Sequence, residues 1–242
     1  MAENSASTAT WRFRFAGDEE ACVWNWKTDG PPDLGRLVPI RRPRSSERHR
    51  HIPVSAYSVT MRDHLELESG LEHDLLRSLD RLPAVVALVP QPCQLASTGS
   101  TRVRNTPDLL SLDDTGVVTL WNARPEHRMN EQFRAQVAMV EAACATVGWR
   151  HEVFVGLGQT KRLNLLWLHG YRRRPSWYEQ VAGEIATAAA REAATLGSLF
   201  RLDSGNGEVV AGVWHMVWSG ELVADLSQQL TVETPVRSGS AS

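Results

Sequence analysis

Lysine is nearly absent from this sequence, which carries only Lys27 and Lys161 among its 26 basic residues. A site that needs a cationic side chain must therefore draw almost entirely on arginine, which is always charged and cannot act as a general base. Cysteine is also scarce, because the chain has three cysteines and no CxxC spacing. This scarcity argues against a disulfide framework or a zinc knuckle and predicts a reduced, cytoplasmic protein.

Long apolar runs are missing as well. No stretch approaches the roughly 18 apolar residues of a membrane-spanning helix, so a membrane is not expected as a partner. The first ten residues have no basic segment followed by an apolar one, so no secretory signal is expected. The net charge of −2 shows that the chain as a whole is not a polycation.

Positive charge is instead concentrated in two arginine clusters, one between Arg36 and Arg50 and the other at 172–174. Such clusters can neutralise DNA phosphates. A solvated arginine-rich loop is the alternative interpretation of the same composition. The candidate DNA-binding residues are Arg41, Arg42, Arg44, Arg48, Arg50, Arg172 and Arg173.

The first two thirds of the chain alternate between helix and strand patterns. Ser69 followed by Glu72 forms a capping box and predicts a helix over 69–80. Helices interleaved with strands predict an α/β core with a mixed central sheet flanked by helices. The other expected elements are two short strands over 11–26, an irregular segment over 28–60, strands at 84–89, 102–112, 117–123 and 153–155, and a helix over 130–147.

After Pro175 the pattern changes to helices over 177–196 and 208–218, followed by alternation over 221–225 and 229–233. Two helices and a hairpin in this order predict a small winged-helix-like C-terminal domain. The expected organisation is a disordered segment at 1–10, N-terminal strands and an Arg-rich segment at 11–60, a core at 61–172, the C-terminal domain at 173–236 and a flexible tail at 237–242.

One arrangement of polar residues points to chemistry. Asp108 follows Pro107 in one expected strand, and the next strand ends with Asn122 and Arg124. Side chains two apart in a strand share a face, so a tight hairpin can bring these residues to one end of a sheet, beside Glu72. An acid on a helix, a P-D on one strand and a polar-x-basic triplet on its neighbour is the layout of PD-(D/E)xK nucleases. Their chemistry needs a hard cation with oxygen ligands and a positive charge beside the phosphate.

The chain further resembles the endonuclease subunits of TnsA-like heteromeric transposases, over roughly residues 39 to 236. The resemblance implies a restriction-endonuclease-like core that hydrolyses a phosphodiester in double-stranded DNA at transposon ends. It also implies a DDE-type transposase and an AAA+ regulator as partners. The residues that carry it are Glu68-Ser-Gly-Leu-Glu72, Leu79-Asp80, Gln91-Pro92, Pro107-Asp108, Ala123-Arg124-Pro125, Gly148-Trp149, residues 164–168, Tyr171-Arg172 and residues 222–225.

Carried over by position, the resemblance makes Glu72, Asp108, Asn122 and Arg124 the catalytic residues. Glu72, Asp108 and Asn122 are then the ligands of Mg²⁺ or Mn²⁺, and Glu68 is a weaker candidate. Asn122 stands where the motif has an acid and Arg124 where it has a lysine. The first change removes a negative charge, and the second leaves a group that cannot accept a proton.

Other interpretations stay open. Glu72 can be only a capping-box acid, and Asp108, Asn122 and Arg124 can be solvent-facing strand residues. The whole chain can be a catalytically silent subunit for DNA binding or transpososome assembly. A winged-helix regulator is a third possibility, but the stretch EVVAGVWHMVW at 208–218 has no Arg or Lys, so we favour partner contacts for this helix.

Overall fold

The computed structural model of the chain describes residues 9–41, 54–98 and 103–239. The chain divides into an N-terminal unit of Met1–Leu76 and Val85–Gly156 and a C-terminal unit of Arg77–Ala84 and Leu157–Ser242. The expected boundary after residue 172 therefore differs from the observed one. The boundary differs because Leu165 and Leu168 are buried in the core of the C-terminal unit.

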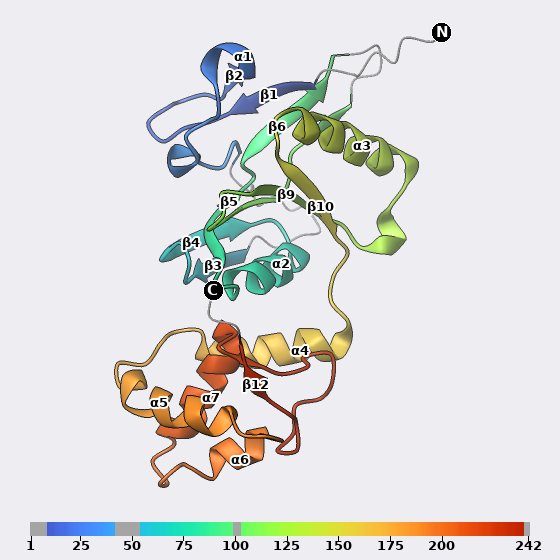
Figure 1. The fold of residues 1–242 in the computed structure, drawn as a ribbon. Helices are drawn as coiled ribbons and strands as arrows, with labels where there is room; N and C mark the ends of the chain where they lie inside the picture. Colours follow the sequence, from blue (N-terminus) through green and yellow to red (C-terminus); the bar gives the residue numbers. More distant parts are fainter. Residues whose placement is uncertain (1–8, 42–53, 99–102, 240–242) are drawn as a thin grey trace. The chain divides into compact units, whose positions relative to one another are not determined.

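The N-terminal unit is built around a four-stranded sheet in the order β10-β9-β8-β5. The strands are β5 (Val85–Pro90), β8 (Leu109–Asp113), β9 (Val118–Ala123) and β10 (Arg150–Phe154). β8 is antiparallel to both β5 and β9, whereas β10 runs parallel to β9, and Figure 1 shows β9 and β10 side by side. The predicted α/β class and the mixed sheet are confirmed.

Two helices of the core begin where the sequence signals place them. Asn130 accepts a hydrogen bond from the Phe133 amide and starts α3 (Glu131–Thr146), which packs against β10. Gly148, at a φ of 73°, turns the chain from α3 into β10. The other helix is α2 (Gly70–Asp80), in agreement with the predicted 69–80.

A second sheet of the N-terminal unit has the order β2-β1-β6-β7. Its strands are β1 (Ala9–Phe13), β2 (Cys22–Trp24), β6 (Cys93–Ser97) and β7 (Arg104–Asn105). The hairpin expected over 11–26 is thus present as β1 and β2. One core connects the two sheets and α3 through Trp11, Phe13, Leu95, Leu120 and Val140, each of which is buried.

The stretch expected to be irregular contains regular structure. β3 (Val54–Ser58) pairs antiparallel with β4 (Asp63–Leu67), so the prediction of an irregular 28–60 is wrong for its last residues. The alternating burial of Ala56, Ser58, Leu65 and Leu67 gives this pair an inner face. The shorter helices of this unit are α1 (Trp26–Asp29), η1 (Leu34–Arg36) and η2 (Glu126–Arg128).

The C-terminal unit is mainly helical and has a core of its own. Its helices are α4 (Gln159–Leu168), η3 (His169–Tyr171), α5 (Tyr178–Ala189), α6 (Leu196–Phe200) and α7 (Glu208–Ser219). α7 crosses α5 at Gly212, where an added Cβ would lie 3.0 Å from Ile185. Arg81 donates hydrogen bonds to the carbonyl oxygens of Val217 and Trp218 at the end of α7.

Two predictions for this unit are wrong. The helix expected over 177–196 ends at Ala189, and Ala193 has a φ of 57° before Thr195 caps α6. The expected hairpin of 221–225 with 229–233 does not form, because β11 (Leu222–Val223) pairs with β12 (Arg237–Ser238). The tail predicted to be flexible from 237 therefore begins with a strand. Among the residues described, no helix combines the length and apolar character needed to cross a membrane.

Candidate active site

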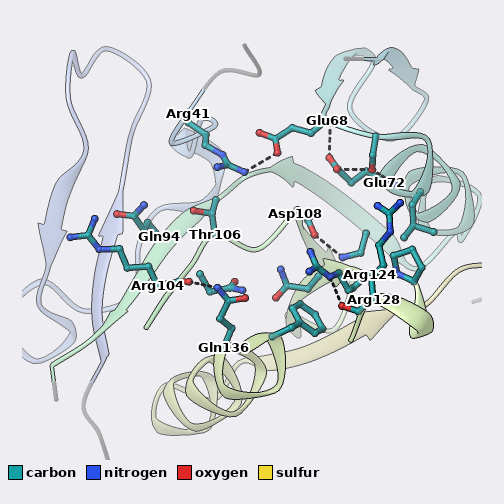
Figure 2. Close-up of a pocket in the computed structure, with 17 residues that line it drawn as sticks. Arg41, Glu68, Glu72, Gln94, Arg104, Thr106, Asp108, Arg124, Arg128 and Gln136 are labelled. Carbon is teal, nitrogen blue, oxygen red and sulfur yellow. Dashed lines mark hydrogen bonds and ion pairs between the residues drawn. The ribbon is translucent and has the colours of Figure 1, made fainter. Parts of the chain in front are cut away.

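A cleft of about 510 Å³ opens in the N-terminal unit, and all four predicted catalytic residues line it. Glu72 comes from α2, Asp108 from the residue before β8, Asn122 from β9 and Arg124 from just beyond β9. Figure 2 shows Asp108 and Arg124 facing the same space, with Glu72 across from them. The helix and the hairpin thus bring to one place residues that lie up to 52 positions apart, from Glu72 to Arg124.

Glu72 occupies the first turn of α2, where the sequence predicts a capping box. Ser69 Oγ donates to Glu72 Oε1 at 2.8 Å and accepts from the Glu72 amide at 3.2 Å. The other carboxylate oxygen accepts from the Glu68 amide at 2.8 Å. Glu72 is therefore a capping acid, and the same carboxylate lines the cleft. Its oxygens keep lone pairs beyond these bonds, so capping and ligand roles are compatible.

Asp108 is fixed by main-chain groups on both sides. Its amide donates to the Trp121 carbonyl at 2.7 Å, and its carbonyl accepts from the Gln91 amide at 3.0 Å. Its carboxylate accepts a 2.6 Å bond from the Ala123 amide. Gln91 is fully buried and adopts a φ of 38°, a left-handed conformation that is uncommon for a residue with a side chain. The backbone of β5, β8 and β9 therefore determines where this acid lies.

The pKa values of both acids are raised. Burial, followed by the charge of Asp108, raises the pKa of Glu72 to about 7. Burial also raises the pKa of Asp108 to about 6, although hydrogen bonds from Ala123 and Asn122 oppose the rise. Burial is the largest cause of both shifts, so a negative charge on either acid is costly at this position. A cation between the carboxylates would reduce that cost.

Asn122 is buried, and the oxygen of its amide contacts a histidine. Its Oδ1 lies 3.0 Å from Nε2 of His151, and its side chain lowers the pKa of the Asp108 carboxyl. Burial lowers the pKa of His151 to about 4, so this imidazole is neutral near pH 7. In this arrangement the amide presents its oxygen to the histidine.

Arg124 is held with its charge beside the acids. Its guanidinium lies over the Phe133 ring, 5.1 Å from the centroid, and Nε donates to the Arg128 carbonyl at 3.2 Å. Its own amide continues the β9–β10 pairing by donating to the Phe154 carbonyl. These contacts leave the terminal nitrogens of the guanidinium available to an anion in the cleft.

Further polar residues of the cleft escaped the sequence analysis. Arg104 and Arg128 line it, together with Thr106, Gln94 and Gln136, and the Gln136 amide donates to the Arg104 carbonyl at 2.8 Å. Arg128 could have been noticed from its position four residues after Arg124. Arg104 gave no signal, because its place depends on the pairing of β6 with β7.

The predicted DNA-binding arginines lie in different parts of the chain's structure. Arg41 lines the cleft and pairs with Glu68 at 2.8 Å. Arg172 and Arg173 belong to the C-terminal unit, where Arg172 donates to the His169 carbonyl. Lys161 belongs to the same unit and lines a different pocket, with Asp225. The other predicted members, Arg42, Arg44, Arg48 and Arg50, lie outside the described residues.

The donor set of the cleft can be compared with the needs of a hard cation. Within the described ranges, no three His, Cys, Asp or Glu side chains form a group that could hold a metal ion. The cleft instead offers two carboxylates, Glu72 and Asp108, and the amide of Asn122. Mg²⁺ is commonly held by one or two carboxylates together with water and substrate phosphate. Two acids with raised pKa values and an adjacent amide fit such an ion chemically.

Comparison with known proteins adds no family to this geometry. No protein-family model matches the sequence, and no curated protein matches it.

Proposed function

We propose that this chain is a metal-dependent DNA endonuclease subunit of a heteromeric, TnsA-like transposase. The observation that carries the proposal is the convergence of Glu72, Asp108, Asn122 and Arg124 on one cleft. The order α2, β5, β8, β9, α3, β10, with a mixed sheet, supports a restriction-endonuclease-like core. The resemblance of the sequence supplies the transposase assignment.

The charges in the cleft suit a DNA phosphate. Arg41, Arg104, Arg124 and Arg128 line a space that also contains the acids, so a phosphodiester meets positive charge around a negative centre. Glu72 and Asp108 would hold Mg²⁺ or Mn²⁺, with Asn122 as the neutral third donor. When bound, such an ion supplies Lewis-acid polarisation of the phosphate and lowers the pKa of attacking water.

Arg124 takes the position of the motif lysine and acts by charge. Its guanidinium can hold two phosphate oxygens at once and stabilise the negative charge that grows during hydrolysis. It cannot remove a proton from water. Among the described residues that line the cleft there is no lysine or histidine. Among these described residues, the carboxylates of Glu72 and Asp108 are the groups that could take the proton of the attacking water.

The C-terminal unit is assigned to partner contacts within this proposal. Most of α7 is buried, including Val213, Met216 and Trp218, and the helix carries no Arg or Lys. A buried, uncharged helix does not suit direct reading of a DNA groove. We therefore expect the C-terminal unit to bind the DDE-type transposase or the AAA+ regulator.

The proposal is tested by nicking of supercoiled plasmid and of DNA that contains transposon ends. The full chain is incubated with Mg²⁺ or Mn²⁺, alone and with a DDE-type transposase encoded beside it. Nicking that needs the metal and is lost in Asp108→Asn supports the nuclease. The transposase assignment also expects genes for a DDE transposase and an AAA+ ATPase in the immediate neighbourhood.

A catalytically silent subunit is the second candidate, favoured by the neutral Asn122 and by Arg124 at the two motif positions. It predicts DNA or partner binding without cleavage, and no rise of the melting temperature with Mg²⁺ or Mn²⁺. A metal-dependent rise that disappears in Glu72→Ala would count against it.

A further inference from the structure

The sheet β2-β1-β6-β7 has a buried inner face and an outer face that is basic. Trp11, Leu95 and Asn105 lie side by side on β1, β6 and β7, and all three are buried. The residues next to them in each strand point the other way, because side chains alternate along a strand. The outer face therefore carries Arg12 on β1 and Arg104 on β7, and both arginines are exposed.

The strand between these two arginines, β6, fixes their spacing. Gln94 of β6 is opposite Arg12, and Ala96 of β6 is opposite Arg104. Neighbouring strands are about 4.8 Å apart and successive residues about 3.4 Å, which places the Cα atoms of the two arginines roughly 12 Å apart. At this spacing the two guanidinium groups can contact two phosphates of a nucleic acid.

The positive charge of the outer face is not neutralised within the sheet. The four strands contain no Asp or Glu. In the part of the chain that the structure describes, no carboxylate pairs with Arg12 or Arg104. Arg12 donates to the carbonyl oxygen of Ala21 at 2.9 Å, a bond that leaves its charge in place. The acidic residues 18–20 belong to the exposed turn between β1 and β2, away from β7.

The outer face continues into the cleft. Gln94, Arg104 and Thr106 all line the cleft, and Figure 2 shows these three residues together on the side away from Glu72. Arg12 lies beyond the cleft lining, on the next strand after β6. A chain of polar and basic side chains therefore leads from the acids across β7 and β6 to β1.

We propose that the outer face of β1, β6 and β7 binds the backbone of the duplex DNA beside the scissile phosphate, with Arg12 and Arg104 as phosphate contacts. This inference rests on the proposed function of the cleft. Arg, Gln and Thr side chains are common donors to DNA phosphates. A protein is the less suitable occupant, because the core of a protein interface is mainly apolar. Among the described residues of the four strands, Val23 alone is a large apolar residue with an exposed side chain.

Binding of a fluorescent duplex of about 30 base pairs by the full chain, in EDTA so that no cleavage occurs, tests the inference. Arg12→Gln and Arg104→Gln each remove a charge but keep an amide donor. Each should weaken binding by about 5- to 10-fold at about 0.1 M salt and lower the slope of log K against log salt by about 1. The double variant should lose about 30-fold or more, and about 2 in slope. Unchanged affinity and slope in both single variants would overturn the inference.

Two controls separate a phosphate contact from a general effect of charge. Arg12→Lys keeps the positive charge, so its salt slope should stay close to that of the natural chain. Arg134→Gln removes a charge from α3, where Arg134 is exposed and outside the cleft, and should leave the slope unchanged. A loss in Arg134→Gln as large as that in Arg12→Gln would show that binding follows total charge, and the inference would be wrong.

Nicking with Mg²⁺ distinguishes this inference from the proposed function. Because Arg12 lies outside the cleft, Arg12→Gln should raise KM by about 5- to 10-fold and leave kcat within about twofold. Normal nicking with an unchanged KM would overturn the inference and leave the nuclease intact. If the natural chain does not nick DNA, the nuclease proposal fails, and the salt slopes alone decide whether the face binds DNA. A double variant that binds DNA normally but no longer binds the DDE-type transposase would assign the face to a protein and overturn the inference.

Discussion

The backbone amide of Ala123 donates a 2.6 Å hydrogen bond to the carboxylate of Asp108, 15 positions earlier in the chain. This bond joins the residue before β8 to the last residue of β9, at the end of the sheet where the cleft opens. An asparagine at position 108 can accept the same bond through its Oδ1 atom. The charge of this residue can therefore be removed without removing the contact that positions it.

Asp108→Asn should abolish cleavage while the fold is kept. We expect nicking to fall by about 100-fold or more, because one of two acidic ligands is lost and the electrostatics of the cleft change. Circular dichroism of the variant should match that of the natural chain. Asp114→Asn is the matched control, because Asp114 is exposed in the β8–β9 turn and does not line the cleft. Unchanged nicking in Asp108→Asn would exclude this acid as a ligand.

The pH dependence of stability should carry the signature of raised carboxyl pKa values. The pKa of Glu72 rises from 4.5 to about 7 and that of Asp108 from 3.8 to about 6, so both groups stabilise the folded chain while protonated. This contribution is complete below about pH 4 and is lost as the pH rises through 6 and 7. Asp108→Asn should therefore be more stable than the natural chain at pH 8, by about 1–3 kcal/mol. Denaturant unfolding at pH 4 and pH 8, without divalent cations, measures the difference. A variant that is equally destabilised at both pH values would contradict the prediction.

Mg²⁺ should stabilise the chain more strongly as the pH rises. Binding of a cation competes with protonation of Glu72 and Asp108, so affinity increases while these groups ionise. With about 10 mM Mg²⁺ in the assay, we expect the melting temperature to rise clearly at pH 8 and only slightly at pH 5. Glu72→Gln should remove most of this rise. An equal effect of Mg²⁺ at both pH values would indicate binding elsewhere on the chain.

Lysine at position 124 should preserve part of the nicking activity. Arg124→Lys keeps the positive charge but loses the planar contact with Phe133 and the Nε bond to the Arg128 carbonyl. We expect nicking to fall by about 10-fold in Arg124→Lys and about 100-fold in Arg124→Ala. The control is Arg134→Ala, because Arg134 is exposed on α3 outside the cleft. If lysine raises activity above the natural level, the position requires a group that can lose its proton.

Arg81 should stabilise the end of α7 in the C-terminal unit. Its guanidinium donates to the Trp218 carbonyl at 3.1 Å and to the Val217 carbonyl at 3.0 Å. Arg81→Met keeps most of the apolar stem and removes both bonds, at a cost of about 2–4 kcal/mol. Hydrogen exchange should become faster in the last turns of α7. Exchange in α7 that stays at the natural rate would show that these bonds contribute little.

The sequence predicted those elements whose signals are local. α2 and α3 were expected from Ser69 and Asn130, which act as caps through contacts within a few residues. β6 and the β3–β4 pair were missed, because their burial depends on partners that the local pattern does not reveal. The hairpin expected between 221–225 and 229–233 did not form for the same reason. β11 pairs instead with β12, and the paired residues lie up to 16 positions apart, as Leu222 and Ser238 do.

The candidate site shows the same division. Glu72, Asp108, Asn122 and Arg124 were proposed because a motif fixes their residue types and order. His151 was not proposed, because only the parallel pairing of β9 with β10 places it beside Asn122. A single histidine 29 positions from its partner leaves no pattern in the sequence. Residues that support a site from behind are therefore the hardest to predict from the sequence.

Asp108 is held in place by hydrogen bonds to the main chain of Gln91, Trp121 and Ala123. The side chains of these three residues take no part in the bonds. Any residue other than proline supplies the donor at 123, and any residue supplies the carbonyl at 121, whereas position 91 must also adopt a left-handed backbone conformation. Neighbouring side chains can consequently drift over evolutionary time while this corner of the sheet still presents its carboxylate at the same point. The shape of the corner can outlast the similarity of the sequences that build it.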